Sequence, residues 1–347
     1  MELSIIVPVY NMAADDKLKH CMDSLIAQTV DEYEIIAVDD ASTDESLKVL
    51  RSYEKKYPGI VKVIACKENQ RQGGAKNAGL EQASGKWVGF IDSDDWIMPD
   101  MYQKLIKKAD ATGADLVGCD YAIVTSYCEP DKIKQTQMQV VENNTQQQTG
   151  VLDEEKHKKL ILRSGSMVVK IYLRQIIEEN HLRFPERMFY EDNCAAPLWS
   201  MYFTHFERVE EPLYFYLTLP ASTTHHVTWD KCQDRMKAAK LLLEESRARG
   251  FFQQYQKEIE FRFTELFYVT TLFSYMYSGK RQSIKHTRWL KKQMLEAVDR
   301  FWENPYYTSM VAAEDQKFIR IQMKSNVIFF LYYRLLFAYR KLRKGVR

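Results

Sequence analysis

Short apolar runs alternate with amphipathic stretches through the first third of the chain. The runs are short enough for buried strands, and the residues between them place apolar side chains at helical spacing, as at Leu18, Met22 and Leu25. Predicted strands cover Ser4–Val9, Glu34–Val38, Val61–Ala65, Trp87–Ile91 and Leu116–Tyr121. This alternation predicts an α/β fold with a Rossmann-like, mostly parallel sheet and crossover helices.

Capping residues predict where the helices of this part begin. Asp15 or Asp16 is expected to cap the first helix. The run Ser42–Glu45 has the form of a capping box for the second helix, and Pro99 suits the first turn of a later one.

The pattern becomes wholly helical from about Lys231 onward, without a repeat of fixed period. The polar, glutamine-rich residues 131–150 are expected to form an exposed hairpin or a mobile loop. Helices are expected at Met236–Ala248, Tyr255–Tyr277, Ile284–Phe301 and Asp315–Phe337. We therefore expect a domain over residues 1–228, followed by a helical C-terminal region over residues 229–347.

Composition and charge narrow the class of protein. A hydrophobic share of 46% and a charged share of 28% are those of an ordinary globular protein, and a net charge of +2 gives no global basis for nucleic-acid binding. The six cysteines contain no C-x-x-C pair, which favours reduced thiols. Leu3–Val9 lacks the basic leader and long apolar core of a secretory signal. These features predict a cytoplasmic protein.

The segment Val327–Tyr339 is strongly apolar but contains Arg334, and it is shorter than the ~20 apolar residues of a membrane-spanning helix. Five basic residues and no acid follow between positions 340 and 347. Two interpretations stay open. Residues 327–347 could lie peripherally on an anionic membrane, or they could form a terminal helix that packs against the protein.

Acidic residues follow two of the predicted strands directly. Asp92, Asp94 and Asp95 end the run WVGFIDSDDW, and Asp39 and Asp40 follow the second strand. The carboxyl ends of parallel strands share one edge of a sheet, where α/β proteins bind ligands. Clustered carboxylates repel one another unless a cation lies between them, and oxygen ligands favour Mg²⁺ or Mn²⁺.

The segment Asn69–Gly79 adds groups that bind anions. Gly73 and Gly74 permit close backbone approach, Arg71 and Lys76 supply positive charge, and the helix N-terminus offers free N–H groups. The segment matches neither a Walker loop nor a G-x-G-x-x-G fingerprint. Between the two acidic clusters, it completes a predicted nucleotide site.

Four motifs in this order resemble the family 2 glycosyltransferases of GT-A fold, of the bacterial surface-polysaccharide type. They are Val7–Asn11, Val38–Ser42, Asn69–Gly79 and Phe90–Asp95, and weaker similarity extends through Tyr190–Asn193 and Tyr214–Tyr216. The resemblance implies a nucleotide-binding half over residues 1–120 and an acceptor half over residues 121–228. Lys76 departs from the arginine that is more frequent in the family, which keeps the charge but loses bidentate binding.

The resemblance also implies roles for single residues. Pro8, Tyr10 and Asp40 would line the nucleobase pocket, and Asn11 and Asp39 belong to the same nucleotide-binding motifs. Asp92 would hold the ribose or water on the metal, and Asp94 would bind the metal itself. Asp192 would be the general base, with Glu191 beside it; the alternative is an acid pair that caps a helix. His226, next to His225, is a further candidate metal ligand, against the simpler interpretation of a loop residue.

The chain is accordingly expected to be an inverting, metal-dependent glycosyltransferase. The donor would be a nucleotide-sugar linked to UDP, and the acceptor a glycan or a lipid-linked glycan in cell-surface polysaccharide synthesis. A peripheral place on the inner face of the plasma membrane and a homodimer are both compatible with the sequence. The alternative is a non-catalytic nucleotide-sugar-binding or scaffold protein. A sugar-nucleotide pyrophosphorylase is disfavoured, because Pro8–Asn11 stands where such enzymes carry a glycine-rich loop.

Overall fold

The computed structural model describes residues 1–127, 138–218, 227–278 and 282–344, apart from the side chains of residues 341, 343 and 344. The chain divides into two compact units, Met1–Pro220 and Ala221–Arg347. Each is described by itself below. The functional halves expected within residues 1–228 stay predictions.

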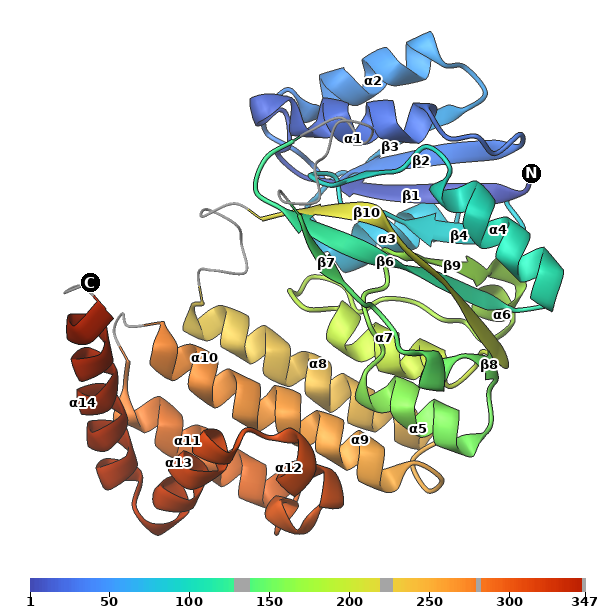
Figure 1. Cartoon of the computed structure of the whole chain (residues 1–347). Coiled ribbons are helices and arrows are strands. Elements are labelled where there is room, and N and C mark those ends of the chain that lie inside the picture. The colour runs from blue at the N-terminus through green and yellow to red at the C-terminus, as the bar shows by residue number, and fades with distance from the viewer. Residues whose placement is uncertain (128–137, 219–226, 279–281, 345–347) are drawn as a thin grey trace. The chain divides into compact units, whose positions relative to one another are not determined.

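The first unit is built on one ten-stranded sheet with the order β3-β2-β1-β4-β9-β6-β10-β5, in which β7 pairs with β6 and β8 with β10 (Figure 1). The strands are β1 Leu3–Val9, β2 Tyr33–Asp39, β3 Val61–Ala65, β4 Trp87–Phe90, β5 Trp96–Ile97, β6 Leu116–Val124, β7 Gln139–Val141, β8 Gly150–Val151, β9 Lys170–Leu173 and β10 His205–Leu217. Most of the paired residues lie in parallel registers, which confirms the predicted mixed α/β class with a mostly parallel sheet.

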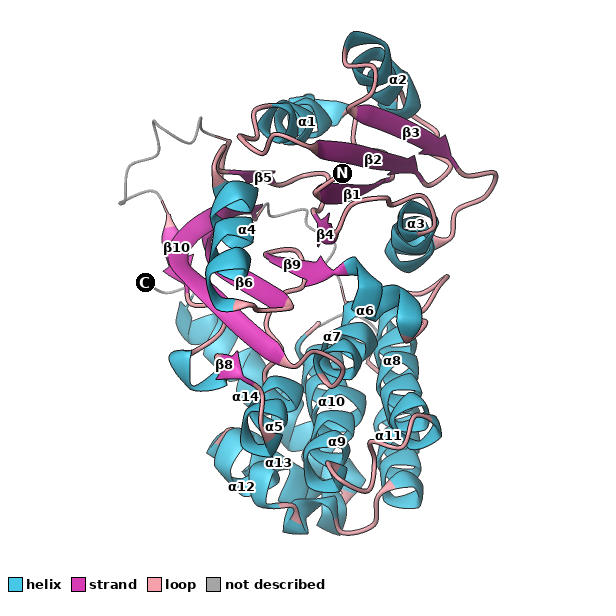
Figure 2. Cartoon of the chain, turned by 90° about the vertical axis from the view of Figure 1, so that its right-hand side faces the viewer, coloured by secondary structure: helices cyan, strands magenta, loops and turns pink. Residues whose placement is uncertain are grey.

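Seven α-helices accompany the described strands of this unit. They are α1 Lys17–Ile26, α2 Ser46–Lys56, α3 Arg71–Leu80, α4 Met101–Thr112, α5 Glu154–Leu162, α6 Arg174–Glu179 and α7 Asp192–Ser200. In Figure 2, α1 and α2 lie on one side of the parallel strands and α3 on the other. Because β1 is covered on both faces, every residue in it is buried.

The predicted helix starts agree with the structure in part. Asp16 is the N-cap residue of α1, but neither it nor Asp15 caps the helix through its side chain, and both have left-handed backbone angles. The Ser42–Glu45 capping box is also absent. Asp44 instead accepts a hydrogen bond from the N–H of Ser46, while the Ser42 hydroxyl accepts one from the N–H of Asn11.

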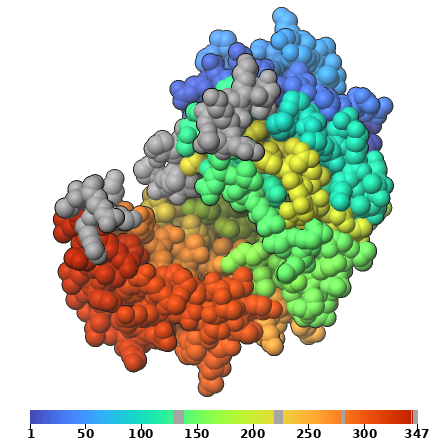
Figure 3. All heavy atoms as spheres, viewed as in Figure 1, coloured from blue at the N-terminus to red at the C-terminus, as the bar shows by residue number. Residues whose placement is uncertain are grey.

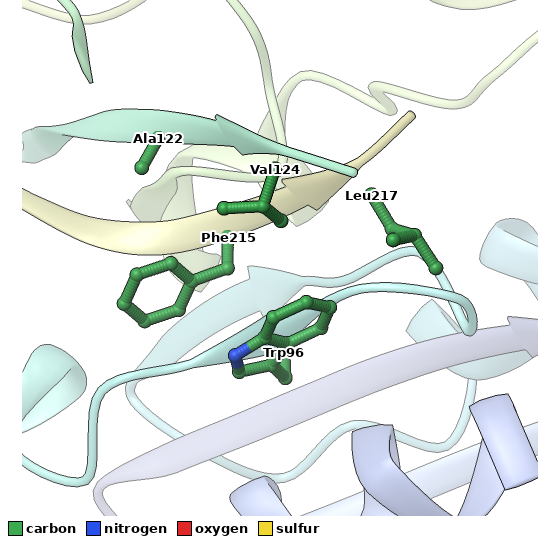
Figure 4. Packing of buried hydrophobic residues seen from close by; sticks show 5 residues of the cluster. All are labelled: Trp96, Ala122, Val124, Phe215 and Leu217. Atoms are coloured by element: carbon green, nitrogen blue, oxygen red, sulfur yellow. The ribbon is translucent and has the colours of Figure 1, made fainter. Parts of the chain in front are cut away.

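Strands β9 and β10 were not predicted, although they complete the sheet. β10 runs parallel to β6, with register shifts on either side of Pro212. A buried cluster of Trp96, Ala122, Val124, Phe215 and Leu217 joins β5, β6 and β10 (Figure 4). Part of the glutamine-rich segment is ordered, because β7 and β8 join the sheet and Gln148 is buried. Residues 131–137 lie outside the described residues.

The second unit is helical throughout its described part, as expected. Its α-helices are α8 Trp229–Ala248, α9 Gln256–Phe263, α10 Thr271–Tyr277, α11 Ile284–Ala297, α12 Pro305–Met310, α13 Ala313–Lys324 and α14 Asn326–Lys344, and a π-helical segment, Thr264–Thr270, joins α9 to α10. The single helix predicted at Asp315–Phe337 is instead broken at Ser325. The backbone of Ser325 is extended, and the Ser325 hydroxyl accepts a hydrogen bond from the N–H of Ile328.

Candidate nucleotide-sugar site

The loops after β1 and β2 are held together by Asn11. Its side-chain oxygen accepts a hydrogen bond from the N–H of Thr43 at 2.8 Å, and its own N–H donates to the Ser42 hydroxyl at 3.0 Å. Asn11 has a φ of 53°, which an asparagine adopts more readily than most residues. Pro8 is buried beside Val38, whereas Tyr10 is 41% exposed. Tyr10 is therefore available to a ligand, and Asn11 shapes the loop.

Both acids after β2 are almost fully buried. Asp39 accepts a hydrogen bond from the N–H of Ser42 through Oδ2, while its buried Oδ1 has no hydrogen-bond partner among the described residues. Asp40 accepts one from the N–H of Gln70 at 2.7 Å. Burial raises the pKa of Asp40, and the N–H groups of Gln70 and Arg71 oppose that rise. Asp40 thus fixes the start of α3, and Asp39 keeps an unsatisfied acceptor.

The three acids after β4 have different surroundings. Asp92 accepts a hydrogen bond from Gln72 on α3 at 3.1 Å. No other described residue donates a hydrogen bond to the Asp94 carboxylate, and burial raises its pKa. Asp95 is buried and accepts hydrogen bonds from the Tyr214 hydroxyl and from the N–H of Leu217. Asp92 and Asp94 remain partly exposed to solvent, so Asp95 is the structural member of the group.

Helix α3 is joined along its length to the loop that leads into α7. The Asn77 side chain pairs with Phe184 by accepting from its N–H and donating to its carbonyl oxygen, each at 2.9 Å. The N–H of Arg187 donates to the carbonyl of Gln70. A Cβ atom at Gly73 would lie 1.9 Å from the carbonyl oxygen of Pro185. The close approach predicted for Gly73 is therefore to this loop.

The neighbouring residues of α3 also contact protein groups. A Cβ atom at Gly74 would lie 2.4 Å from Cβ of Gln70, so Gly74 serves the first turn of the helix. The Arg71 guanidinium lies over the Phe189 ring, 4.4 Å from its centroid, and remains exposed. Lys76 is 3% exposed, and its ammonium group lies 2.8 Å from Oε1 of Glu191. The Lys76 ammonium thus pairs with a protein carboxylate.

The acid pair at the start of α7 divides into a buried and an exposed member. Glu191 is 3% exposed and paired with Lys76, whereas Asp192, the first residue of α7, is exposed. Desolvation by the surrounding protein, and then the charge of Glu191, raise the pKa of Asp192 to about 6, and the charge of Lys76 opposes this rise. Desolvation also raises the pKa of Asp92 to about 6, with Lys76 again opposing and Asp94 and Glu191 contributing. One electrostatic cluster therefore joins the acids after β4 to those of α7.

Comparison with known proteins agrees with this arrangement. The sequence profile described as "Glycosyl transferase family 2" matches residues 4–179. "Putative glycosyltransferase EpsH" of Bacillus subtilis is 32% identical over 267 residues, which cover 75% of this chain and 72% of EpsH. The chain belongs to glycosyl transferase family 2. "Uncharacterized glycosyltransferase EpsJ" of the same organism is 31% identical over 228 residues, which cover 64% of this family 2 chain but only 62% of EpsJ.

The fold of this family 2 member is that of solved GT-A proteins. The crystal structure of Staphylococcus aureus TarS 1-349 in complex with UDP-GlcNAc superposes with a TM-score of 0.67 at 19% identity, covering 98% of this chain and 92% of that one. The likeness includes a Rossmann-like domain and a helical C-terminal region, so it confirms the predicted fold class.

The chemistry of the acids in this family 2 site suits a hard divalent cation. No other described residue donates a hydrogen bond to the Asp94 carboxylate, although the charge of Lys17 acts on it, and Asp92 lies beside it as a like charge. Among the residues described, no three histidine, cysteine or acidic side chains gather into a metal-binding group. A magnesium-type ion often takes one or two carboxylates and completes its shell with phosphate and water. Asp92 and Asp94 fit that donor set.

Tyr214 and Trp199 of this family 2 chain are each 1% exposed and belong to the core. His225 and His226 lie outside the described residues. Three residues that support the site were not predicted. Gln72 donates a hydrogen bond to Asp92, and Asn77 holds the 184–191 loop. The ring of Phe189 lies under the Arg71 guanidinium. Glutamine, asparagine and phenylalanine carry no distinctive signal in a single sequence.

Proposed function

We propose that this protein transfers a sugar from a nucleotide-sugar to a hydroxyl group of a glycan or lipid-linked acceptor, with inversion at the anomeric carbon. The observation that carries the proposal is the electrostatic cluster in which Lys76 interacts with Asp92, Glu191 and Asp192. It combines Asp92, a carboxylate suited to hold a divalent cation, with Asp192, an exposed carboxylate of raised pKa. Membership of family 2 supports the reaction class.

The donor would bind across the carboxyl ends of β1, β2 and β4. Tyr10 is exposed beside the buried acids Asp39 and Asp40, and a carboxylate of this pair would accept a hydrogen bond from a base N–H. Asp40 is the acceptor expected from the sequence, and Asp39 has a buried Oδ1 with no hydrogen-bond partner among the described residues. Asp94 and Asp92 would hold Mg²⁺ or Mn²⁺, which would neutralise charge on the diphosphate. Arg71 remains exposed at the start of α3 as a cation for the phosphates. UDP is the first nucleotide to test, because TarS, of the same fold, is described in complex with UDP-GlcNAc.

Asp192 is the candidate general base. The acceptor oxygen would form a bond to the anomeric carbon as the bond from that carbon to the diphosphate oxygen breaks. The electron pair leaves with the diphosphate, and the hydroxyl proton passes to the Asp192 carboxylate. A single displacement inverts the configuration. Glu191 is buried and neutralised by Lys76, so we assign it to positioning Asp192 instead of proton transfer.

A panel of nucleotide-sugars tests this proposal. Hydrolysis or transfer should appear with one donor in the presence of Mn²⁺ or Mg²⁺, and UDP with the metal should raise the melting temperature, because a ligand that binds only the native state shifts unfolding. Absence of turnover with every donor, together with nucleotide binding, would favour the alternative of a nucleotide-sugar-binding scaffold. Absence of any nucleotide binding would overturn both.

A further inference from the structure

The described part of α14 has two different faces. Phe329, Phe330 and Tyr333 are buried against the rest of the second unit. A second set of apolar side chains on the same helix is exposed, namely Val327 45%, Ile328 61%, Leu331 56%, Tyr332 40%, Leu335 70%, Tyr339 60% and Leu342 72%. One face of α14 therefore packs against the protein, whereas the other face stays exposed.

The exposed residues form one continuous stripe. At 3.6 residues per turn, Ile328, Leu331, Tyr332, Leu335, Tyr339 and Leu342 all fall within an arc of about 100°. We call these six residues the α14 stripe. Contiguous exposed apolar surface on a protein marks an interaction site more often than scattered residues do. The helix lies at the surface of its unit, in dark red in Figure 3.

The positive charge of α14 indicates which kind of partner could cover the α14 stripe. The helix contains five basic residues, Arg334, Arg340, Lys341, Arg343 and Lys344, and no acid, and Arg340 is paired with Glu314 of α13 at 2.6 Å. Two copies of α14 packed stripe to stripe would bring like charges together without a carboxylate on either helix to pair with them. An anionic surface meets no such penalty. The charge therefore disfavours self-association and favours a negatively charged partner.

Helix α11 extends the basic character beside α14. A cavity of about 490 Å³ lies between Arg288, Lys291 and Lys292 of α11 and Asn326 and Val327 at the start of α14. The ammonium group of Lys291 already has hydrogen-bond partners, because it donates to the carbonyl oxygens of Gln322 and Met323. Arg288 and Lys292 are exposed at the cavity, and Lys292 lies 3.7 Å from Oε1 of Glu296, which also lines the cavity. Cations thus lie beside the apolar stripe at the N-terminal end of α14.

We propose that the α14 stripe inserts into the surface of an anionic lipid bilayer, with Arg288 and Lys292 contacting lipid phosphates. An apolar face with aromatic residues and a basic border is typical of helices that lie in the membrane interface. No described helix is long and apolar enough to cross a bilayer. The helix therefore lies along the interface. This inference concerns attachment and does not rest on the transferase activity proposed above.

Vesicle sedimentation tests the proposal with the 347-residue chain and without any sugar donor. The chain should sediment with vesicles of equimolar phosphatidylcholine and phosphatidylglycerol, and much less with phosphatidylcholine alone. The double variant Leu331→Ser/Leu335→Ser should lower the partition coefficient ~10-fold or more, because two apolar side chains no longer insert. Arg288→Gln and Arg334→Gln should each lower it about five-fold, and binding should weaken as salt rises.

A matched control removes apolar surface elsewhere. Val140 and Val151 are 52% and 69% exposed on β7 and β8, so Val140→Ser/Val151→Ser removes similar exposure from the first unit and should leave vesicle binding unchanged. Circular dichroism and melting temperature verify folding of each variant. The proposal is overturned if the wild-type chain ignores anionic vesicles or if the α14 variant binds as well as the control. It is also overturned if light scattering shows a dimer that only the α14 variant dissociates, since a second copy would then cover the stripe.

Discussion

The ammonium group of Lys76 lies 2.8 Å from Oε1 of Glu191, and both side chains are almost completely buried. The two residues come from different parts of the first unit, because Lys76 is on α3 and Glu191 immediately precedes α7. Burial alone would lower the pKa of Lys76, but the charges of Glu191 and Asp92 raise it, so Lys76 keeps its positive charge. This ion pair therefore ties the nucleotide-binding loop to the helix that carries Asp192.

Removing one member of the pair should cost more than removing both. Lys76→Met leaves Glu191 buried without a cation, and we expect a loss of ~3–5 kcal/mol in the free energy of unfolding. The double variant Lys76→Met/Glu191→Met should recover most of that loss, because an apolar pair can replace a buried ion pair at little cost. Urea unfolding of the three proteins measures both effects. Equal destabilisation by the single and double variants would contradict the ion pair.

Asp192→Asn should lower turnover by on the order of 10²–10⁴ while leaving UDP affinity unchanged, since the amide cannot accept the acceptor's proton. Asp230 provides the control, because it is also an exposed acid in the first turn of a helix. Asp230→Asn should keep full turnover. Steady-state kinetics and calorimetric titration with UDP separate the two quantities. A normal rate in Asp192→Asn would exclude this residue as the base.

The acid limb of the pH–rate profile should lie near pH 6. The pKa of Asp192 is raised to about 6, so the base is protonated below this pH and becomes competent as pH rises through it. Lys76 lowers the pKa of Asp192, and Glu191 raises it. The Lys76→Met/Glu191→Gln variant removes both charges. The shift of its acid limb therefore measures which of the two charges has the larger effect on Asp192. A limb that stays near pH 4 in the wild-type protein would contradict the assignment.

The acids at the ends of β2 and β4 could be predicted because each cluster follows an apolar run directly, whereas Glu191 and Asp192 were assigned from the family resemblance. Asp39 and Asp92 need only strand prediction and the rule that parallel strands end at one edge. The partners of the charged groups could not be predicted, since Lys76 meets Glu191 across 115 residues and Tyr214 meets Asp95 across 119. A single sequence assigns Lys76 a charge but not the carboxylate that neutralises it.

The missed strands have local causes. β9 begins with the buried Lys170, and β10 contains the run Glu210-Glu211-Pro212, where the pairing with β6 shifts register. Charged residues and a proline interrupt the apolar pattern by which a strand is predicted, and the pairing of such a strand comes from long-range contacts. The parallel half of the sheet lacks such interruptions, so its strands were found near their observed bounds.

Asp94 and Asp95 are adjacent but should respond differently to the same substitution. Asp94→Asn should abolish the Mn²⁺-dependent part of UDP binding with little change in stability, because no other described residue hydrogen-bonds to its carboxylate. Asp95→Asn should instead lose about 1–3 kcal/mol of stability, because its buried oxygens accept from Tyr214 and Leu217. Melting curves with and without UDP and Mn²⁺ measure both. The reverse pattern would show that Asp95 is the metal ligand.

Gly73→Ala tests the contact between α3 and the loop that leads to Asp192. Glycine to alanine within a helix normally stabilises by about 1 kcal/mol, so the substitution would be favourable if α3 stood alone. Here the new Cβ would lie 1.9 Å from the carbonyl oxygen of Pro185, and the loop must move. We expect a net loss of about 1–3 kcal/mol in urea unfolding and a fall in turnover larger than the change in UDP affinity. A Gly73→Ala protein as stable as the wild type would mean that α3 and this loop are not in contact.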